Sequence, residues 1–385
     1  MKTTSGLLLL IFAFFLVQGC KKEETHMPGK PNYHIYNAYF NANPAPIVPF
    51  GNNEFVMTAN DNTNGYFTFI RSKINGEELV HKTMAMTSSS GSYCIAVSGN
   101  SSIFALTSII KDWTTQKYDL ILLKLTENGD TVWTKTYGGP LGEISRTMKK
   151  TNDGGVIACG YIQQAGGSGI NDFFAWKLDA DGNTQWYKNF YTNSSAYVTD
   201  VTEMENGDFV LVGPSNAGST FVLKINAAGA EIKKNTIISN NFIQTNGICA
   251  TKDGKLICVG GGTGDIAIIK LDANLKAMWS KSLGYSEQSE FAYSVVSNGD
   301  DTYTVAGTST GPKSSGNQDI LVAKFNAEGG GIWYRSFGGK SADAAYGVIK
   351  TQDNLNMVVG NTSSFNSSFA TQIFTVLLDN SGDFK

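Results

Sequence analysis

Charged residues are scarce in this sequence, and no stretch gathers the basic ones. Asp, Glu, Lys and Arg make up 16% of the 385 residues, and the formal net charge at pH 7 is −3. A surface that binds nucleic acid needs clustered Lys and Arg to neutralise the phosphates. We therefore expect no nucleic acid partner.

Histidine is rarer still, and its three copies are far apart. His26, His34 and His81 share no spacing that could hold zinc. Residues 61–65 and 179–182 begin like calcium loops, but neither has the bidentate carboxylate that such a loop needs at its far end. We interpret both stretches as turns. The sequence predicts no metal, no cofactor and no residue that we can assign as catalytic.

The sequence also lacks an apolar run long enough to cross a bilayer. Residues 7–17 form an apolar run of about 11 residues, whereas a membrane-spanning helix needs about 20. Met1 and Lys2 supply a short basic start before this run. The combination predicts a signal peptide rather than a transmembrane helix.

Residues 16–20, Leu-Val-Gln-Gly-Cys, resemble the lipobox of bacterial lipoproteins, although Gln18 departs from the small or hydroxyl residue usual there. The resemblance implies loss of residues 1–19 and attachment of fatty acyl chains such as palmitate to Cys20. Two or three chains make a stable anchor, because each buried CH₂ contributes about 0.8 kcal/mol. A plain secretory peptide with an incidental cysteine is the alternative.

The charged segment after Cys20 indicates where the protein is located in the cell. Residues 21–24, Lys-Lys-Glu-Glu, resemble the surface-export signal of some Gram-negative lipoproteins, and Lys21 is not the aspartate associated with retention in the inner membrane. A charged, flexible tether over residues 20–31 fits the same residues. We expect an outer-membrane lipoprotein that is exposed on the cell surface, with the membrane as its partner through the anchor.

Glycine and aromatic residues are plentiful, with 42 Gly and 11% Phe, Trp and Tyr. After the leader, short runs of alternating or β-branched and aromatic residues are separated by Gly, Asn and Asp. These patterns are typical of strands and tight turns, and no helical periodicity accompanies them. The sequence therefore predicts an all-β protein.

One unit recurs along the chain, most clearly over residues 319–363. A basic residue of its third expected strand falls at Arg71, Lys124, Lys177, Lys224, Lys270 and Lys324, with Leu377 in the seventh place. The spacings of 53, 53, 47, 46, 54 and 53 residues give a period near 50. Periods of that size point to solenoids, propellers or arrays.

Each unit is predicted to form four short strands. The two ends of the chain indicate that the units form a closed ring and not an open array. The first hairpins of the units start near Pro46, Tyr93, Arg146, Tyr197, Asn246, Tyr293 and Tyr346. The last unit stops after its third strand, while an extra strand over residues 33–40 precedes the first unit. That strand could complete the last unit and remove the exposed edges of an open array.

We therefore predict that residues 32–385 form a seven-bladed β-propeller of four-stranded antiparallel blades, closed by an N-terminal strand that completes the last blade. Six or eight blades remain the alternatives. The units resemble the short bacterial β-propeller repeats of secreted and surface proteins, with the pattern D-x-x-x-x-K-hydrophobic-x-x-x-G-x-x-x-W. The resemblance implies the fold over nearly all of residues 32–385, but it does not specify a function.

Two sets of residues have expected structural roles. Large aromatics repeated at the blade period are expected to pack between neighbouring blades; they are Trp133, Trp186, Trp279 and Trp333. Cys94, Cys159, Cys249 and Cys258 fall on strands that read as buried. Counting from the turn at residues 251–254 places Cys249 opposite Leu256 and Cys258 opposite Gly247. We therefore expect free thiols.

A possible ligand-binding face follows from the register. Three carboxylates, Glu143, Glu290 and Asp343, each lie three residues before Arg146, Tyr293 and Tyr346, respectively, and are predicted to surround the mouth of a central channel together with Tyr197. Such a face could bind a cation, a sugar or a peptide amine. Capping of the loops by the carboxylates is the alternative. Long Ser-, Asn- and Gly-rich loops at residues 109–117, 162–170, 308–318 and 362–371 could add to the face.

The favoured functional hypothesis is a non-enzymatic binding or assembly module on the outer membrane, with a surface protein or glycan as its partner. The competing hypothesis is a glycan hydrolase or lyase that uses carboxylates and tyrosines at the channel mouth. That enzyme would require Glu143, Glu290 and Asp343 to converge within about 10 Å, with at least one shifted pKa. A surface scaffold without a small ligand is a third possibility.

Overall fold

The computed structural model describes residues 33–39, 47–61, 66–86, 94–112, 114, 117–163, 171–194, 196–215, 218–239, 244–284, 288–311, 317–364 and 371–385. The expected signal peptide, Cys20 and the tether lie outside these residues. Much of the four long loops also lies outside them. Among the described residues, no helix has the length and apolar character needed to span a membrane.

The described residues form 28 β-strands. In chain order, the first half comprises β1 (Tyr33–Tyr39), β2 (Ile47–Phe50), β3 (Glu54–Asp61), β4 (Tyr66–Lys73), β5 (Glu78–Ala85), β6 (Cys94–Val97), β7 (Ile103–Asp112), β8 (Lys117–Leu125), β9 (Thr131–Tyr137), β10 (Gly142–Lys150), β11 (Val156–Gln163), β12 (Asn171–Leu178), β13 (Thr184–Ser194) and β14 (Asp200–Glu203). The second half comprises β15 (Phe209–Ser215), β16 (Ser219–Ile225), β17 (Glu231–Ile238), β18 (Gln244–Ala250), β19 (Leu256–Gly261), β20 (Ile266–Leu271), β21 (Ala277–Leu283), β22 (Ser289–Ser297), β23 (Thr302–Thr310), β24 (Asp319–Asn326), β25 (Gly331–Phe337), β26 (Asp343–Lys350), β27 (Asn356–Thr362) and β28 (Gln372–Leu378).

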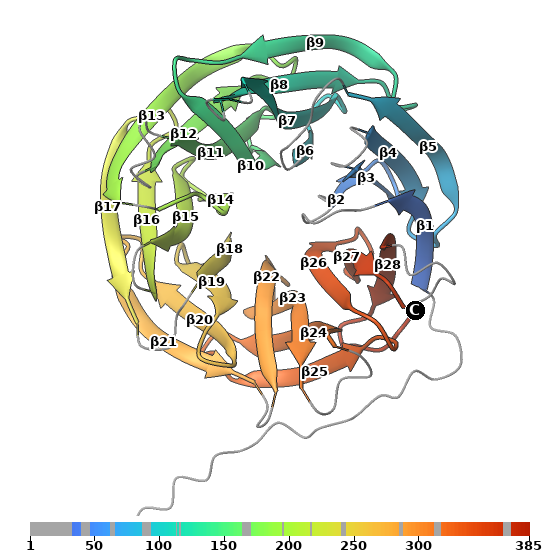
Figure 1. The fold of residues 1–385 in the computed structure, drawn as a ribbon. Helices are drawn as coiled ribbons and strands as arrows, with labels where there is room; N and C mark the ends of the chain where they lie inside the picture. The colour runs from blue at the N-terminus through green and yellow to red at the C-terminus, as the bar shows by residue number, and fades with distance from the viewer. Residues whose placement is uncertain are drawn as a thin grey trace, which may run out of the picture.

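The strands are arranged as a propeller, with sheets placed radially around one axis (Figure 1). Five sheets are four-stranded and antiparallel, and they comprise β2–β5, β6–β9, β10–β13, β14–β17 and β26–β28 with β1. The sixth sheet has eight strands, because β18–β21 and β22–β25 are joined through a single pair, Gly261 with Phe291. The predicted all-β propeller of four-stranded units is confirmed. The structure differs from the predicted seven separate blades, since two four-stranded units share one sheet.

The depth of each strand in the ring explains its composition. The first strand of each unit lies nearest the axis and the fourth lies outermost (Figure 1). Second and third strands are covered on both faces, and β12 and β24 are almost continuously buried. Outer strands such as β5 and β9 alternate between exposed and partly buried residues. Hydrophobic runs therefore mark the middle strands, and alternation marks the outer ones.

The N-terminal strand closes the ring as the sequence predicts. Strand β1 pairs antiparallel with β28 and becomes the outermost strand of the sheet formed by β26–β28. Tyr36 in β1 is only 1% exposed, and its hydroxyl lies 3.0 Å from Ser72 Oγ and 3.4 Å from Thr375 Oγ1. This one side chain therefore contacts both the first sheet and the last.

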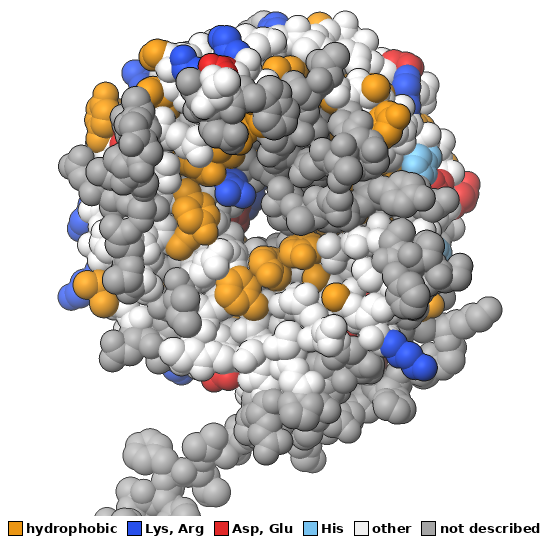
Figure 2. Space-filling model, in the orientation of Figure 1, with side chains coloured by type: hydrophobic (Ala, Val, Ile, Leu, Met, Phe, Trp, Pro, Cys, Tyr) orange, Lys and Arg blue, Asp and Glu red, His pale blue; other side chains and the backbone are white. Residues whose placement is uncertain are grey.

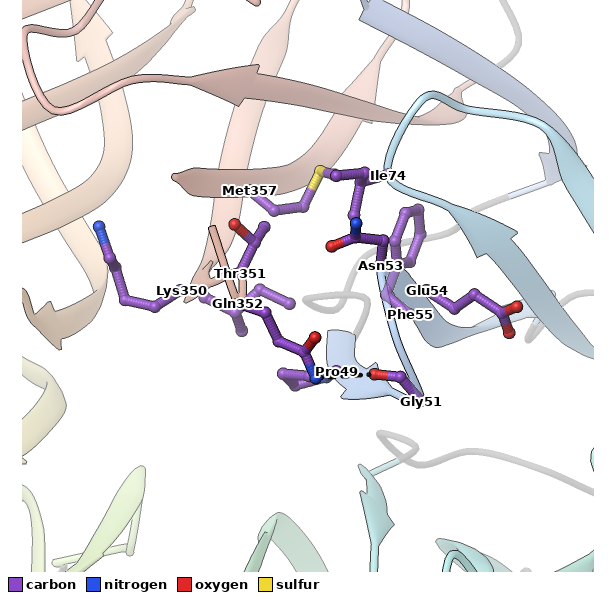
Figure 3. A pocket seen from close by; sticks show the side chains of 11 residues that line it. Pro49, Gly51, Asn53, Glu54, Phe55, Ile74, Lys350, Thr351, Gln352 and Met357 are labelled. Carbon is purple, nitrogen blue, oxygen red and sulfur yellow. Dashed lines mark hydrogen bonds between the residues drawn. The ribbon is translucent and has the colours of Figure 1, made fainter. Parts of the chain in front are cut away.

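The inner part of the same junction is held by polar contacts (Figure 3). Gln352 Nε2 donates to the carbonyl oxygen of Gly51 and to Asn52 Oδ1, each at 3.3 Å. The cavity between these elements has a volume of about 20 Å³, which is enough for one water molecule. The junction is therefore a packed closure and not a ligand site.

The repeated tryptophans pack between neighbouring sheets, as expected. Trp186 Nε1 donates to the Ala227 carbonyl at 2.9 Å, and Trp333 Nε1 donates to the Asn380 carbonyl at 2.9 Å. Each ring lies against a glycine with positive φ in the turn of the next unit; the pairs are Trp133 with Gly182, Trp186 with Gly229, Trp279 with Gly329 and Trp333 with Gly382. A Cβ at these glycines would lie within 3 Å of ring atoms, so the turn glycine and the tryptophan fit together.

The four thiols within the described residues are free, in agreement with the prediction. The predicted register was wrong by one residue on the β19 side, because Cys249 lies opposite Ile257 and Cys258 lies opposite Ile248. The turn is one residue longer than the count assumed, since Thr251 N donates to the Lys255 carbonyl at 2.9 Å.

Candidate ligand-binding sites

The innermost strands of four units carry a β-bulge at the same place. The ladder between the first and second strands skips one residue in four units; the skipped residues are Arg146, Asn246, Tyr293 and Tyr346. A bulge leaves its extra residue unpaired and redirects the side chain. Three of the seven predicted site residues are therefore bulge residues.

A glycine on the second strand accompanies each bulge. At Gly160, Gly260, Gly307 and Gly360, a Cβ would lie 1.8–2.0 Å from the carbonyl oxygen two residues before the bulge residue. Gly213 makes the same approach to the carbonyl of Tyr197. The residue equivalent to Arg146 in that unit is consequently Thr199. The sequence alignment of Tyr197 with Arg146 was wrong by two residues, because β14 starts later than the repeat predicts.

Three of the four bulge residues contact the innermost strand region of the next unit. The Cζ atom of Arg146 lies 5.5 Å from the centre of the Tyr197 ring, and the Tyr293 and Tyr346 rings are 4.8 Å apart. The remaining two units use hydrogen bonds, from Thr199 Oγ1 to the Thr245 carbonyl at 3.0 Å and from Asn246 Nδ2 to the Ala292 carbonyl at 2.8 Å. Residues redirected by the bulges therefore connect neighbouring units around the axis.

Arg146 is the charged member of this group, and its environment is unusual. Its guanidinium lies 5.3 Å from the Tyr161 ring and 5.5 Å from the Tyr197 ring. The Nε atom is buried and has no hydrogen-bond partner, and within the described residues no carboxylate forms an ion pair with Arg146. Figure 2 shows a basic side chain and groups of hydrophobic side chains around the central hollow of this face.

A guanidinium normally satisfies its five donors with carboxylate, phosphate or carbonyl oxygens. Arg146 lies against two tyrosine rings, and its Nε–H has no hydrogen-bond partner among the described residues, so its guanidinium can bind an anionic group of a ligand at little cost in rearrangement.

A second aromatic group, defined by Phe291, Tyr293 and Tyr346, lies on β22 and β26, beyond the unit formed by β18–β21. The centroids of Phe291 and Tyr293 are 5.1 Å apart. Burial raises the pKa of both tyrosine hydroxyls, while hydrogen bonds with Thr308 and Asn361, respectively, oppose the shift. Both hydroxyls therefore remain protonated at neutral pH and can donate hydrogen bonds.

The three predicted carboxylates are buried, and two of them, Glu143 and Asp343, hold the loops between units. Gly139 N donates to Glu143 Oε1 at 3.0 Å, and Gly339 N donates to Asp343 Oδ2 at 2.7 Å. Asp343 also accepts hydrogen bonds from Thr362 Oγ1 at 2.5 Å and Ser364 Oγ at 2.6 Å. Glu290 is 2% exposed beside Gly284. These contacts support the loop-capping alternative for Glu143 and Asp343.

The carboxylates do not assemble into a metal site. Within the described part of the chain, no group of three or more His, Cys, Asp or Glu side chains is placed to hold a metal ion.

Glu143 has a second role, because it lines a pocket of about 540 Å³ beside β9, β12 and β13. The lining residues are Leu120, Thr136, Tyr137, Gly138, Gly139, Pro140, Leu141, Glu143, Ile162, Trp176, Thr184, Tyr187 and Asn189. The predicted site contains only Glu143 of this set. The sequence offered one sign of this pocket, which is a departure from the repeat. Trp176 occupies the position that smaller residues occupy in other units; these are Leu123, Ile269 and Ala323.

The electrostatics of the pocket centre on Glu143. Its burial raises its pKa and the charge of Asp119 adds to the rise, while the Gly139 N–H and Lys111 oppose it. Lys111 Nζ lies 3.0 Å from Asp119 Oδ2, so the lysine is already paired. Glu143 Oε2 is buried, and no described residue forms a hydrogen bond with it. A polar group from a ligand could satisfy this oxygen.

Comparison with known proteins bears on the fold alone. No protein-family model matches the chain, and no curated protein matches its sequence. A solved structure of puromycin hydrolase, the S511A mutant complexed with PGG, is 13% identical with a TM-score of 0.56, and the match covers 89% of this chain and 53% of that one. The chain thus spans about half the length of that hydrolase.

The polysaccharide lyase Uly1 is similar over almost its full length. It is 12% identical with a TM-score of 0.53, and the match covers 92% of this chain and 94% of that one. Identities this low show a shared fold and leave the function to be argued from the sites.

Proposed function

We propose that this protein is a lipid-anchored, non-enzymatic binding module of the outer membrane, and that it binds a saccharide bearing an acidic group at the centre of the propeller face. The proposal takes the eight-stranded sheet as two blades that touch at one residue pair, which makes a seven-bladed ring. It rests mainly on Arg146, whose guanidinium lies against two adjacent tyrosine rings, with a buried N–H donor that has no hydrogen-bond partner among the described residues.

The acidic group follows from the chemistry of Arg146. Arginine binds carboxylates and sulfates through paired N–H donors, and such charge-assisted hydrogen bonds are roughly twice as strong as neutral ones. One guanidinium matches one acidic group, which agrees with the absence of clustered basic residues from the sequence.

The saccharide follows from the tyrosines near the axis. Aromatic rings offer an apolar face to a sugar ring, and tyrosine adds a hydroxyl that can bind its oxygens. Tyr161 and Tyr197 flank Arg146, while Tyr293 and Tyr346 supply a further pair with protonated hydroxyls.

The anchor is tested by replacing Cys20. We expect wild-type protein in the outer-membrane fraction of a Gram-negative host, labelled by palmitate, and accessible to protease added to intact cells. The Cys20→Ser variant should be unlabelled and should leave the membrane fraction. Labelled protein that is protected from the protease would contradict surface exposure but not lipidation.

The binding site is tested with soluble protein that starts after Lys22. A glycan array should include oligosaccharides with uronate or sulfate groups and their neutral counterparts. We expect binding of acidic glycans and at least about tenfold weaker binding by Arg146→Met, since a lost charge-assisted pair costs roughly 1.5–3 kcal/mol.

Lys135→Met is the matched control for that experiment. Lys135 also lies over an aromatic ring, 4.3 Å from the centre of the Trp133 ring, but on the outermost strand β9. Equal binding by Arg146→Met and wild type would contradict the proposed site. Retention of a membrane protein partner instead of any glycan would favour an assembly module.

A glycan hydrolase or lyase is the second candidate, favoured by one observation. Burial and the neighbouring Asp119 raise the pKa of Glu143, and a carboxyl with a raised pKa can act as a general acid. Two structures of similar fold are named as a hydrolase and a polysaccharide lyase. The test is incubation with each bound glycan and measurement of new reducing or unsaturated ends, which Glu143→Gln should abolish.

A further inference from the structure

We propose that the pocket beside β9, β12 and β13 binds an organic ammonium ion with an apolar body. The site is separate from the saccharide site at Arg146 and does not depend on it. Among the described residues that line the pocket, Glu143 is the sole charged one. The side chain is 7% exposed, and its Oε2 atom has no hydrogen-bond partner in the described part of the chain.

The charge around Glu143 favours a cation. The neighbouring Asp119 is 6% exposed, and its Oδ1 atom also has no hydrogen-bond partner among the residues that the structure describes. Lys111 pairs with the other oxygen of Asp119 at 3.0 Å. Two carboxylates therefore face one ammonium group of the protein, and a second cation would neutralise the site.

The aromatic walls select an organic cation over a simple ion. Tyr137 and Trp176 meet edge to face at 4.2 Å, and Trp176 and Tyr187 do so at 6.3 Å. Ring faces attract ammonium groups, most strongly where the cation is removed from water. Tyr187 is 37% exposed, so this wall opens to solvent and gives a ligand a way in.

The remaining lining favours an apolar body over a sugar. Leu120, Pro140, Leu141 and Ile162 are hydrophobic, and the Thr184 hydroxyl already accepts from Trp176 Nε1 at 3.0 Å. Few polar groups are left for the many hydroxyls of a saccharide. A volume of about 540 Å³ falls within the range of small-molecule sites.

The test is a calorimetric titration of the soluble protein with 2-phenylethylamine at neutral pH, alongside its neutral counterpart 2-phenylethanol. The two probes share the apolar body and differ in the ammonium group. We expect saturable binding of the amine and at least about tenfold weaker binding of the alcohol. Glu143→Gln should weaken amine binding by a similar factor while leaving alcohol binding unchanged.

Glu290→Gln is the matched control, because it makes the same substitution at the equivalent position of a unit that does not line this pocket. If Glu143→Gln fails to fold, Tyr187→Ala removes a partly exposed wall and should also weaken amine binding. Equal binding of amine and alcohol, or amine binding that survives both Glu143→Gln and Tyr187→Ala, would overturn the proposal. Saccharide binding in the pocket would overturn it as well. Loss of glycan binding by Arg146→Met has no bearing on this result.

Discussion

The guanidinium of Arg146 lies 5.5 Å from the centre of the Tyr197 ring, although the two residues belong to neighbouring sheets. The β-bulge at Arg146 creates this contact by removing the residue from the ladder between β10 and β11. The arrangement places a charged group where the protein itself offers its buried Nε no hydrogen bond. A buried donor without a partner lowers the free energy of unfolding, but the same donor can form a hydrogen bond with a ligand.

We therefore expect Arg146→Met to separate stability from binding. Removing a partly buried cation with an unsatisfied donor should leave the free energy of unfolding unchanged or slightly higher, while binding of acidic glycans is lost. Thermal unfolding followed by circular dichroism, together with the glycan titration, measures both quantities. A variant that loses stability and binding in parallel would indicate a structural role for Arg146.

The glycines on the second strands, which lie opposite the bulges, should not tolerate a side chain. In Gly307→Ala, the new Cβ would lie 1.8 Å from the carbonyl oxygen of Phe291, so the inner hairpin must shift. We expect a loss of about 1–3 kcal/mol in the free energy of unfolding, measured by urea denaturation.

Gly347→Ala provides the control for that substitution. Its new Cβ would first meet a side chain, Val359 Cγ1, at 3.0 Å, and valine can adjust more easily than backbone. If the two variants were equally stable, the close backbone approach would not be the reason for glycine at position 307.

Closure by β1 should make a large contribution to stability. Tyr36→Ala removes a ring that is 99% buried between the first and last sheets, and we expect a loss of about 3–5 kcal/mol. Tyr36→Phe retains the ring and removes only the hydroxyl contacts, so about 0.5–1.5 kcal/mol should be lost. Chemical denaturation of both variants checks the ranking. Equal losses would mean that the hydroxyl contacts, and not the packing, hold the strand.

The buried carboxyl of Glu143 should make stability depend on pH. Because folding raises its pKa, its contribution is fully present below the unfolded pKa and is lost as the pH rises through the folded one. Besides burial, the groups that act on it include Asp119, Lys111 and the Gly139 N–H. Burial raises the pKa of the neighbouring Tyr187, and the charge of Glu143 adds to that rise.

Glu143→Gln keeps an oxygen for Gly139 and removes this titration. Its melting temperature should exceed that of wild type at neutral pH, and the difference should shrink as the pH falls. A difference that stays constant with pH would show that Glu143 is not the group responsible.

The fold was largely predictable because the repeat encodes it at several levels. The hydrophobic runs of the middle strands, the alternation of the outer strands and the tryptophan paired with the next turn glycine all follow from packing between sheets. The extra N-terminal strand was predictable from the missing one at the C-terminus. The pair Gly261–Phe291, which joins two units into one sheet, has no sequence signal because it depends on the separation of neighbouring strands.

The candidate sites were predictable in part. The repeat identified Arg146, Tyr293 and Tyr346, which the bulges place near the axis, but it misaligned Tyr197 because β14 begins late. Glu143 was selected for a place at the channel mouth, and the repeat did not indicate that it lines a pocket with Tyr137, Trp176 and Tyr187. A periodic pattern reports what the units share, whereas this pocket is built from residues in which one unit differs from the others.

The most direct test of the proposed function is a crystal structure of the soluble protein with an acidic oligosaccharide bound. We predict that the acidic group lies about 2.7–2.9 Å from the Arg146 guanidinium nitrogens, with a sugar ring against Tyr161 or Tyr197. Density for the oligosaccharide on the outer strands or in the Glu143 pocket, with Arg146 uncontacted, would contradict it.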